Sequence, residues 1–352
     1  MKYSEGALSA SSFLLLQFIE KNAMLTSLEA FDFERSLDER RYVKMIYTVT
    51  LNPAVDYVLS LDALSPGEIN RTKTEAVVTG GKGINVSWLL KALGVESTAL
   101  GFIAGFTGEA VRAGVQAQGI SEDFVTLDSG FTRINVKIHA GEETEINGNG
   151  PEIPQEKLDV FFRKLENLSE QDTLVISGSV PRTLPADIYA QIAERAQARG
   201  VRLVVDAAGE LLRSVLRYQP YLVKPNRDEL AALFGEKPET DADVLALTEK
   251  LQALGARNVL VSMAGDGALL RTEGGKSYKA PAAKGTVVNS VGAGDSMVGG
   301  FLAALECGEG FKEALALGTA AGGATAFSVG IADKEKIMAV YETVKMGVEV
   351  LG

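Results

Sequence analysis

The chain has 352 residues, 46% of them hydrophobic, and a formal net charge of −11 at pH 7. That length suits one large domain or two ordinary ones, and the acidic balance argues against a broad basic surface for nucleic acid. The single cysteine, Cys307, excludes an intramolecular disulfide and fits a reducing cytoplasm. The single histidine, His139, excludes a metal site built from several histidines.

Residues 1–44 differ in character from the rest of the chain. Their apolar run SSFLLLQFI, residues 11–19, is shorter than the roughly 18 residues that span a bilayer, and charged residues follow it instead of a cleavage site. We therefore expect neither an anchor nor a signal peptide, no membrane partner and a cytoplasmic location. Met45 opens the strand-like run MIYTVTLNPAVD, which predicts an N-terminal extension of unknown role over 1–44 and one domain over 45–352.

Strand-like and helix-like segments alternate from Met45 onward. Helices are predicted over 108–118, 184–199, 210–217, 227–234 and 241–254, between the strand-like runs STALGFIAG, DTLVISGSVP, VRLVVDAAG, PYLVKPN and RNVLVSMAG. This alternation predicts an α/β fold with a central, mostly parallel sheet and helices on both faces. Ligands of such sheets bind at the carboxyl ends of the strands, where polar or glycine residues follow several of these runs.

Two segments, about 57–79 and 132–150, break this alternation. Their residues alternate with a period of two and contain turn signals, and neither has room for a helical crossover. They predict a small antiparallel sheet separate from the main one, with a pair of surface hairpins as the alternative. Because both flank glycine-rich or basic segments, a lid over the site is the functional interpretation, and His139 is expected to be an ordinary strand or surface residue.

Glycine-rich segments are the candidates for phosphate binding. GGKS, residues 274–277, lacks the earlier glycine of a P-loop, since Leu270 occupies that position, so we expect a hairpin turn. In TGGKGINVSWLLKALG, three glycines would let a ligand approach the backbone, Lys82 supplies a cation and Asn85 opens a helix. A tight turn before a core helix explains that segment equally well.

VGAGDS is the strongest local signal. The N–H groups of Gly292, Ala293 and Gly294 are able to converge on a developing negative charge, at about 3–4 kcal/mol for each donor. Asp295 is able to accept a hydroxyl proton, a role that contributes about 10²–10⁴-fold in rate. The alternative is a cap on a glycine turn. Gly299 and Gly300 fall inside the helix, where we expect close packing.

Several of these segments together resemble one family. GGKGINV and VNSVGAGDSMVGGFLAAL are similar to the two signatures of the ribokinase-like (PfkB) carbohydrate kinases, and VKPNRDEL resembles the N-x-x-E element of that family. The resemblance runs from Met45 to the C-terminus. TLNPAVD, GGKGINV, TRINVKI and TEINGNGP are most similar to the bacterial 1-phosphofructokinases within the family, with the tagatose-6-phosphate kinases as neighbours.

The resemblance implies a fold and an activity. The fold would be a ribokinase-like three-layer sandwich with a small β-sheet lid, through which two chains form a homodimer. The activity would be ATP- and Mg²⁺-dependent phosphorylation of D-fructose 1-phosphate to fructose 1,6-bisphosphate. Tagatose 6-phosphate or another sugar phosphate of the family is the alternative substrate, and a non-catalytic sugar-phosphate sensor is the alternative from another class.

The resemblance also implies roles for individual residues. Asp295 would be the catalytic base toward O6 of the sugar, and Gly292, Ala293 and Gly294 would form the anion hole for the γ-phosphoryl group. The substrate-binding positions would be Asp56, Gly80, Gly81, Lys82, Asn85, Arg133 and Ser177. The nucleotide-binding positions would be Lys224, Asn226, Glu229, Ser262, Gly265 and Gly267, with Glu229 meeting Mg²⁺ mainly through water. Ala264 departs from a glycine common in the family, and its methyl group disfavours positive φ.

Overall fold

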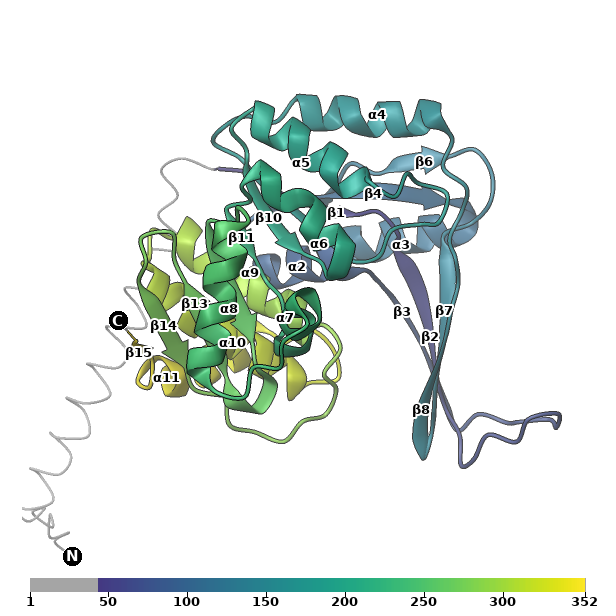
Figure 1. Cartoon of the computed structure of the whole chain (residues 1–352). Coiled ribbons are helices and arrows are strands. Elements are labelled where there is room, and N and C mark those ends of the chain that lie inside the picture. The colour runs from purple at the N-terminus through teal and green to yellow at the C-terminus, as the bar shows by residue number, and fades with distance from the viewer. Residues whose placement is uncertain (1–43, 352) are drawn as a thin grey trace, which may run out of the picture. The chain divides into compact units, whose positions relative to one another are not determined.

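Eleven strands form the main sheet in the computed structural model, which describes residues 44–351 (Figure 1). The sheet has the order β15-β14-β13-β12-β11-β10-β9-β1-β4-β5, and β6 pairs with β4. The strands are β1 (Ile46–Thr50), β4 (Ser97–Ala104), β5 (Ser121–Glu122), β6 (Val125–Leu127), β9 (Thr173–Ser177), β10 (Arg202–Asp206), β11 (Leu222–Val223), β12 (Asn258–Ser262), β13 (Ala268–Arg271), β14 (Ser277–Ala280) and β15 (Glu349–Val350). Pairings from β5 to β12 are parallel and those from β12 to β15 are antiparallel. The expectations for residues 1–43, including the apolar run at 11–19, lie outside the described residues.

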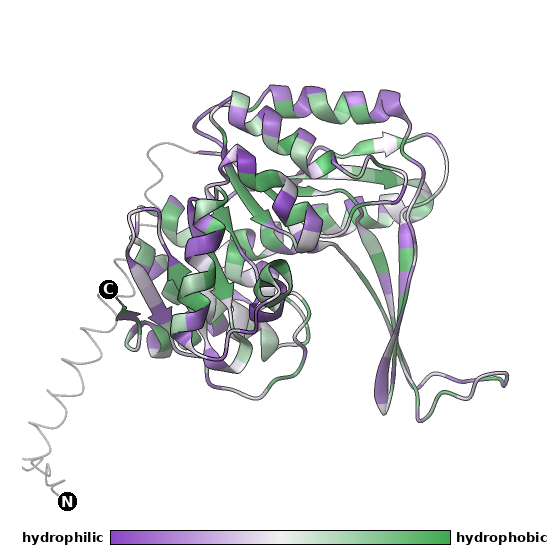
Figure 2. Cartoon of the chain, in the orientation of Figure 1, coloured by the Kyte–Doolittle hydropathy of each residue, from purple (hydrophilic) through white to green (hydrophobic). Residues whose placement is uncertain are grey.

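Helices cover both faces of this sheet. One layer consists of α4 (Gln155–Glu166), α5 (Ile188–Ala198), α6 (Gly209–Val215), α7 (Arg227–Phe234) and α8 (Asp241–Ala253), whose apolar side chains share one core with the sheet. The other consists of α2 (Lys82–Ala92), α3 (Gly105–Ala117), α9 (Ala293–Glu306), α10 (Phe311–Ala326) and α11 (Lys334–Lys345). Figure 2 shows hydrophobic residues along the central strands and alternating polarity on α4. The predicted three-layer α/β architecture is confirmed.

The predicted elements agree with the observed ones at most positions. The helix expected over 227–234 is α7, and the GGKS segment is the turn between the antiparallel strands β13 and β14. PYLVKPN contributes only the two residues of β11, because Pro220 and Pro225 flank them and neither proline has an N–H group for the ladder. Within residues 44–351, no helix is long and apolar enough to cross a membrane.

A second sheet has the order β3-β2-β7-β8. Its strands are β2 (Ala54–Ser60), β3 (Thr74–Gly80), β7 (Arg133–Ala140) and β8 (Glu142–Asn147), and in Figure 1 they extend beyond the main sheet as a long arm. The two hairpins are antiparallel, but β2 and β7 pair in parallel. The expectation of an all-antiparallel sheet was wrong because a long crossover through α2, β4 and α3 separates the two hairpins. His139 is an exposed strand residue, as expected.

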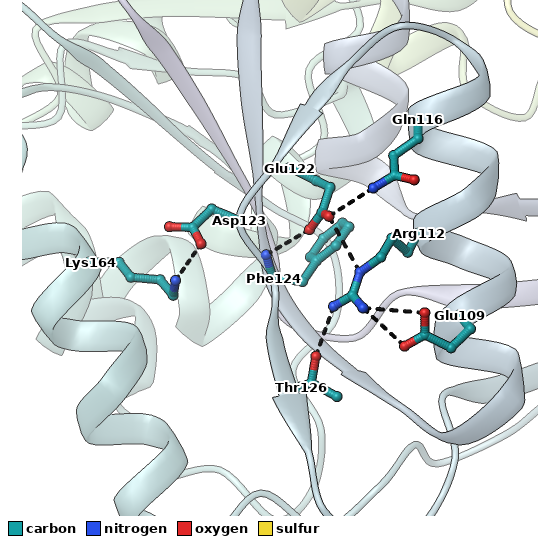
Figure 3. A network of polar contacts seen from close by, with 8 residues as sticks. All are labelled: Glu109, Arg112, Gln116, Glu122, Asp123, Phe124, Thr126 and Lys164. Carbon is teal, nitrogen blue, oxygen red and sulfur yellow. Dashed lines mark hydrogen bonds and ion pairs between the residues drawn. The ribbon is translucent and has the colours of Figure 1, made fainter.

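A polar network fixes α3 to the edge of the main sheet (Figure 3). Arg112 of α3 contacts Glu109 at 3.0 Å and donates a hydrogen bond to Thr126 at 2.8 Å, while its Nε lies 3.3 Å from Glu122. Glu122 and Thr126 belong to β5 and β6, so one guanidinium connects the helix to both short strands. Because α3 also contacts β2 and β3, the base of the small sheet is tied to the main body.

Candidate active site

The first turn of α9 positions Asp295. Gly292, the residue before the helix, has the left-handed φ of +81°, and a Cβ atom there would lie 2.9 Å from Cδ1 of Ile331. A glycine is therefore required where the chain enters the helix. Asp295 is 4% exposed, and Asn85 of α2 donates a hydrogen bond to its Oδ2 at 2.8 Å. Two segments that the sequence singled out separately thus meet at one carboxylate.

The surroundings of Asp295 make it a stronger base than an ordinary aspartate. Burial, together with the nearby Asp206 carboxylate, raises the pKa of Asp295 from 3.8 to about 6. The hydrogen bond from Asn85 and the charges of Lys82 and Lys224 oppose that rise. A pKa near 6 leaves Asp295 ionised at pH 7 and able to accept a proton from a hydroxyl group.

The N-terminus of α9 presents backbone donors beside Asp295. Among residues 44–351, the N–H groups of Gly292 and Gly294 have no protein acceptor, whereas that of Ala293 donates to Ser290 O at 3.2 Å. A Cβ atom on Gly294 would lie 3.3 Å from Nζ of Lys224, so an ammonium group lies alongside these donors. The helix terminus and the lysine together suit a negatively charged ligand.

The two glycines inside α9 serve packing, as expected. A Cβ on Gly299 would lie 2.8 Å from Cδ2 of Leu89 in α2, and one on Gly300 would lie 2.8 Å from Leu317 O in α10. Both distances are too short for a real contact. The missing side chains therefore allow α9 to lie closely against α2 on one side and α10 on the other.

Asp206, at the end of β10, is a site residue that the sequence did not identify. It is 2% exposed, and its two oxygens lie 3.1 Å from Nζ of Lys224 and 3.6 Å from Nζ of Lys82. Burial lowers the pKa of Lys82, but the three carboxylates of Asp206, Asp295 and Glu229 together raise it by more. The net shift is upward, and this lysine stays charged. The strand-end acid in VVDAAG was visible, but its burial between two lysines was not.

The predicted sugar loop lies against the end of β1. Gly81 has a φ of +146°, and a Cβ there would lie 2.4 Å from Cγ2 of Thr50 in β1. The close packing against β1 is thus sufficient to require a glycine, whether or not a ligand binds. Gly80 shows no such restriction, since its added Cβ would be 3.4 Å from Oδ1 of Asn85. Ser177, at the end of β9, is 2% exposed, and its hydroxyl has no hydrogen-bond partner among the described residues. An open buried hydroxyl of this kind suits a ligand.

Asp56 and Arg133 both lie on the small sheet. Asp56 of β2 accepts a hydrogen bond from Asn135 Nδ2 at 2.8 Å, and Lys137 Nζ lies 3.3 Å from its other oxygen. Arg133 of β7 donates from Nε to Asn52 O at 3.1 Å. Arg133 is paired with Ala54, two residues before Asp56, so both side chains are on one face of the sheet. Burial lowers the pKa of Arg133, and the charge of Asp56 partly offsets this. TRINVKI contained Asn135 and Lys137, but sequence reasoning gave neither a role.

The N-x-x-E element forms the start of α7. Asn226 Oδ1 accepts from the N–H of Glu229 at 2.7 Å, and Glu229 Oε2 accepts from the N–H of Asn226 at 2.8 Å, which is a capping box. Asn226 also forms a parallel bridge with Ser262 at the end of β12. Part of the predicted nucleotide site is therefore fixed by helix capping, a structural role that the sequence interpretation did not include.

The residues present fit a magnesium ion that is bound mainly by nucleotide phosphates and water and only partly by protein carboxylates. The described residues contain no cluster of three or more His, Cys, Asp or Glu side chains able to hold a metal. Mg²⁺ usually binds through one or two carboxylates, substrate phosphates and water. Glu229 has one oxygen outside the capping box, and Asp206 Oδ2 has no hydrogen-bond donor among residues 44–351. Within this part of the chain, each carboxylate therefore has one oxygen without a hydrogen-bond donor, although Oδ2 of Asp206 also lies 3.6 Å from Lys82 Nζ, so Glu229 is the better candidate for Mg²⁺.

The loop after β12 carries the remaining nucleotide candidates. Ala264 adopts a φ of +48° although it has a side chain, so the position requires the conformation that glycine would supply without strain. An added Cβ on Gly265 would have open space around it, whereas one on Gly267 would lie 2.1 Å from Ala280 O. Gly265 is accordingly the glycine that leaves room for a ligand.

Comparison with known proteins gives one consistent family. The model of the pfkB family carbohydrate kinases matches residues 49–337. The 1-phosphofructokinase of Bacillus subtilis is 44% identical over 86% of this chain and 99% of its own length, and the D-tagatose-1-phosphate kinase of Bacillus licheniformis is 40% identical over 83% and 96%.

Solved structures agree with the sequence comparison. Phosphofructokinase-2 from Escherichia coli in complex with substrates and products has a TM-score of 0.80 at 27% identity, covering 85% of this chain and 99% of that one. Ribokinase from Arabidopsis thaliana, complexed with ribose and ATP, has a TM-score of 0.71 at 21% identity, covering 85% and 98%, and shows the same fold. This chain belongs to the pfkB family of carbohydrate kinases.

Proposed function

We propose that the chain transfers the γ-phosphoryl group of ATP to O6 of D-fructose 1-phosphate and forms fructose 1,6-bisphosphate. One observation carries the proposal. A buried carboxylate with a raised pKa, Asp295, lies beside the open N–H groups at the start of α9 and the ammonium group of Lys224. A base and a set of donors for anionic oxygens therefore share one small volume.

Each part of this site has a step to perform. Asp295 accepts the proton of the attacking hydroxyl, and the N–H groups of Gly292 and Gly294 stabilise the charge on the transferring group. Lys224 and Lys82, held by Asp206, supply positive charge that a chain of net charge −11 must concentrate locally. Mg²⁺ bound near Glu229 would neutralise nucleotide phosphates, and ATP would lie over the loop that contains Ser262 and Gly265.

The relatives support a ketose 1-phosphate as the acceptor. The two curated relatives described above are named for fructose 1-phosphate and D-tagatose 1-phosphate activities rather than for a 6-phosphate. D-tagatose 1-phosphate is therefore the second candidate substrate, beside tagatose 6-phosphate, which the sequence offered as the alternative to fructose 1-phosphate. A non-catalytic sensor is disfavoured, because the base and the open donors are both present.

A homodimer through the small sheet is part of the proposal. Val77, Tyr57, Val136 and Ile146 are paired across the four strands and form one row on the same face. Val77 is 65% and Ile146 60% exposed, which is unusual for apolar residues that lie together. Light scattering should give twice the chain mass for the wild type and a monomer for Val77→Glu, and a wild-type monomer would refute this.

An ADP-release assay with a panel of acceptors tests the activity. We expect the highest kcat/KM with fructose 1-phosphate, followed by D-tagatose 1-phosphate, and much lower values with fructose 6-phosphate, tagatose 6-phosphate and ribose. A preference for another acceptor would overturn the substrate and leave the kinase activity standing, whereas no acceptor-dependent ADP release would overturn both. Fractionation of cells tests the proposed cytoplasmic location.

A further inference from the structure

The small sheet has one polar face, which carries Asp56. Asp56 is paired across the strands with Asn135, and the next residues of that face, Lys137 and Glu145, are paired with each other. The row Val77, Tyr57, Val136 and Ile146 lies on the opposite face, because successive side chains alternate between faces. Arg133 shares the polar face at the end nearer the main sheet. Arg133, Asn135 and Lys137 thus follow one another outward along β7.

Lys137 is a largely buried cation held between two carboxylates. Its side chain is 13% exposed, and Nζ lies 3.3 Å from Asp56 Oδ2 and 3.5 Å from Glu145 Oε1. Asp56 already has a hydrogen bond from Asn135 at 2.8 Å, so Lys137 is not needed to orient it. Fixing a long lysine side chain costs rotamer entropy, and lysine is not favoured in strands. A role beyond strand pairing would explain why a lysine occupies this position.

Charge balance indicates what that role is. Around Lys137 the polar face holds two acids, Asp56 and Glu145, and two bases, Arg133 and Lys137, and a third acid, Glu143, lies two residues before Glu145 on β8. In a sugar phosphate bound at Asp56 with its O6 toward Asp295, the phosphate on O1 would be at the opposite end of the sugar, and the cations beside Asp56 on this face are Arg133 and Lys137. Without Lys137, that dianion would meet two carboxylates and only one guanidinium, which is repulsive.

We infer that Lys137 is a specificity-determining residue, which binds the phosphate that the sugar already carries. Glu145 holds the ammonium group in place until the phosphate replaces it, while the contact with Asp56 is kept. The inference rests on the proposed function, because it assumes a phosphorylated sugar as acceptor. It explains how the site selects sugar phosphates over free sugars with a group outside the predicted sugar loop.

The test compares three lid variants by steady-state kinetics with fructose 1-phosphate. Lys137→Met should raise KM for the sugar phosphate by about tenfold or more, with kcat and the KM for ATP little changed. Lys73→Met is the matched control, because Lys73 is a more exposed lysine immediately before β3 that pairs with Asp62, and it should leave KM unchanged. Glu145→Gln should not raise KM, since it frees the lysine.

Two kinetic outcomes would overturn the inference. One is a KM for Lys137→Met that stays within about twofold of the wild type. The other is an equal rise in KM for Glu145→Gln, which would mean that the ion pair only braces the sheet.

Calorimetric titration with fructose 1-phosphate in the absence of ATP separates this inference from the proposed function. Tight binding by the wild type and at least tenfold weaker binding by Lys137→Met would support the inference even if no turnover were seen. Equal binding by both proteins would overturn it while leaving the activity intact. A wild-type protein that binds no sugar phosphate would overturn both.

Discussion

Replacing Asp295 by asparagine is expected to lower turnover and raise stability in the same molecule. Asparagine keeps the shape of the side chain and an oxygen that can accept the hydrogen bond from Asn85, but it cannot take a proton from a hydroxyl. General-base catalysis contributes about 10²–10⁴-fold, so kcat should fall by that factor. Stability should rise because the buried charge disappears.

The pKa shift gives the size of the stability change. The folded state keeps the Asp295 proton up to about pH 6, whereas the unfolded chain releases it near 3.8. Stability therefore falls as pH rises between these two values and then stays low. The shift of about 2 units corresponds to about 3 kcal/mol at 1.36 kcal/mol per unit. At pH 8 the Asp295→Asn variant should recover up to that amount, which corresponds to a rise of roughly 5 °C in melting temperature. At pH 4 it should recover almost none.

Thermal unfolding at pH 8 and pH 4.5, combined with the ADP-release assay, tests both effects. Asp62→Asn is the control, because Asp62 is an exposed acid whose loss should change neither quantity much. An Asp295→Asn variant that gains no more stability at pH 8 than at pH 4.5 would refute the electrostatic reasoning. Turnover above about a tenth of wild type would refute the role as base. In the wild type, kcat/KM should fall about tenfold per pH unit below pH 6.

Three further substitutions address other parts of the site. Asp206→Asn should raise the KM values for ATP and sugar phosphate together, by about tenfold each, because both lysines lose their counter-ion; a change in only one KM would contradict the shared role. Ala264→Gly should leave KM for the sugar unchanged and, by relieving roughly 1 kcal/mol of backbone strain, raise the melting temperature slightly; a lower melting temperature would argue against strain. Gly300→Ala should destabilise by about 1–3 kcal/mol in a urea titration, because its Cβ would overlap α10; an unchanged midpoint would show that α9 can shift.

The sequence predicted the elements that depend on hydrophobic periodicity and on glycine and proline turn signals. Alternating strands and helices indicated the layered α/β fold, and GGKS was correctly interpreted as a hairpin turn rather than a phosphate loop. The parallel pairing of β2 with β7 was missed, because hairpin signals describe only neighbours in the chain and this pairing depends on a crossover.

Contacts between distant segments account for the rest of what sequence reasoning missed. Asp206, 2% exposed, is invisible as a site residue until β10 places it between lysines from two other elements. Lys137 could have been noticed as a charge within an alternating strand, but its two carboxylate neighbours come from β2 and β8. Of the residues assigned by resemblance, Asn85 and Lys224 lie against the start of α9, and Lys82 joins Lys224 at Asp206.

The absence of side chains at Gly299 and Gly300 has a mechanical consequence. Because α2 and α10 both lie closely against α9 at these glycines, Asp295 and Asn85 are on helices that cannot separate without opening this packing. We therefore expect any movement that encloses the substrate to come from the arm formed by β2, β3, β7 and β8. Conversely, a methyl group added at Gly299 or Gly300, little more than one turn after Asp295, would displace that carboxylate, and a shift of about 1 Å can cost a hundredfold in rate. Gly300→Ala should therefore lower turnover as well as stability.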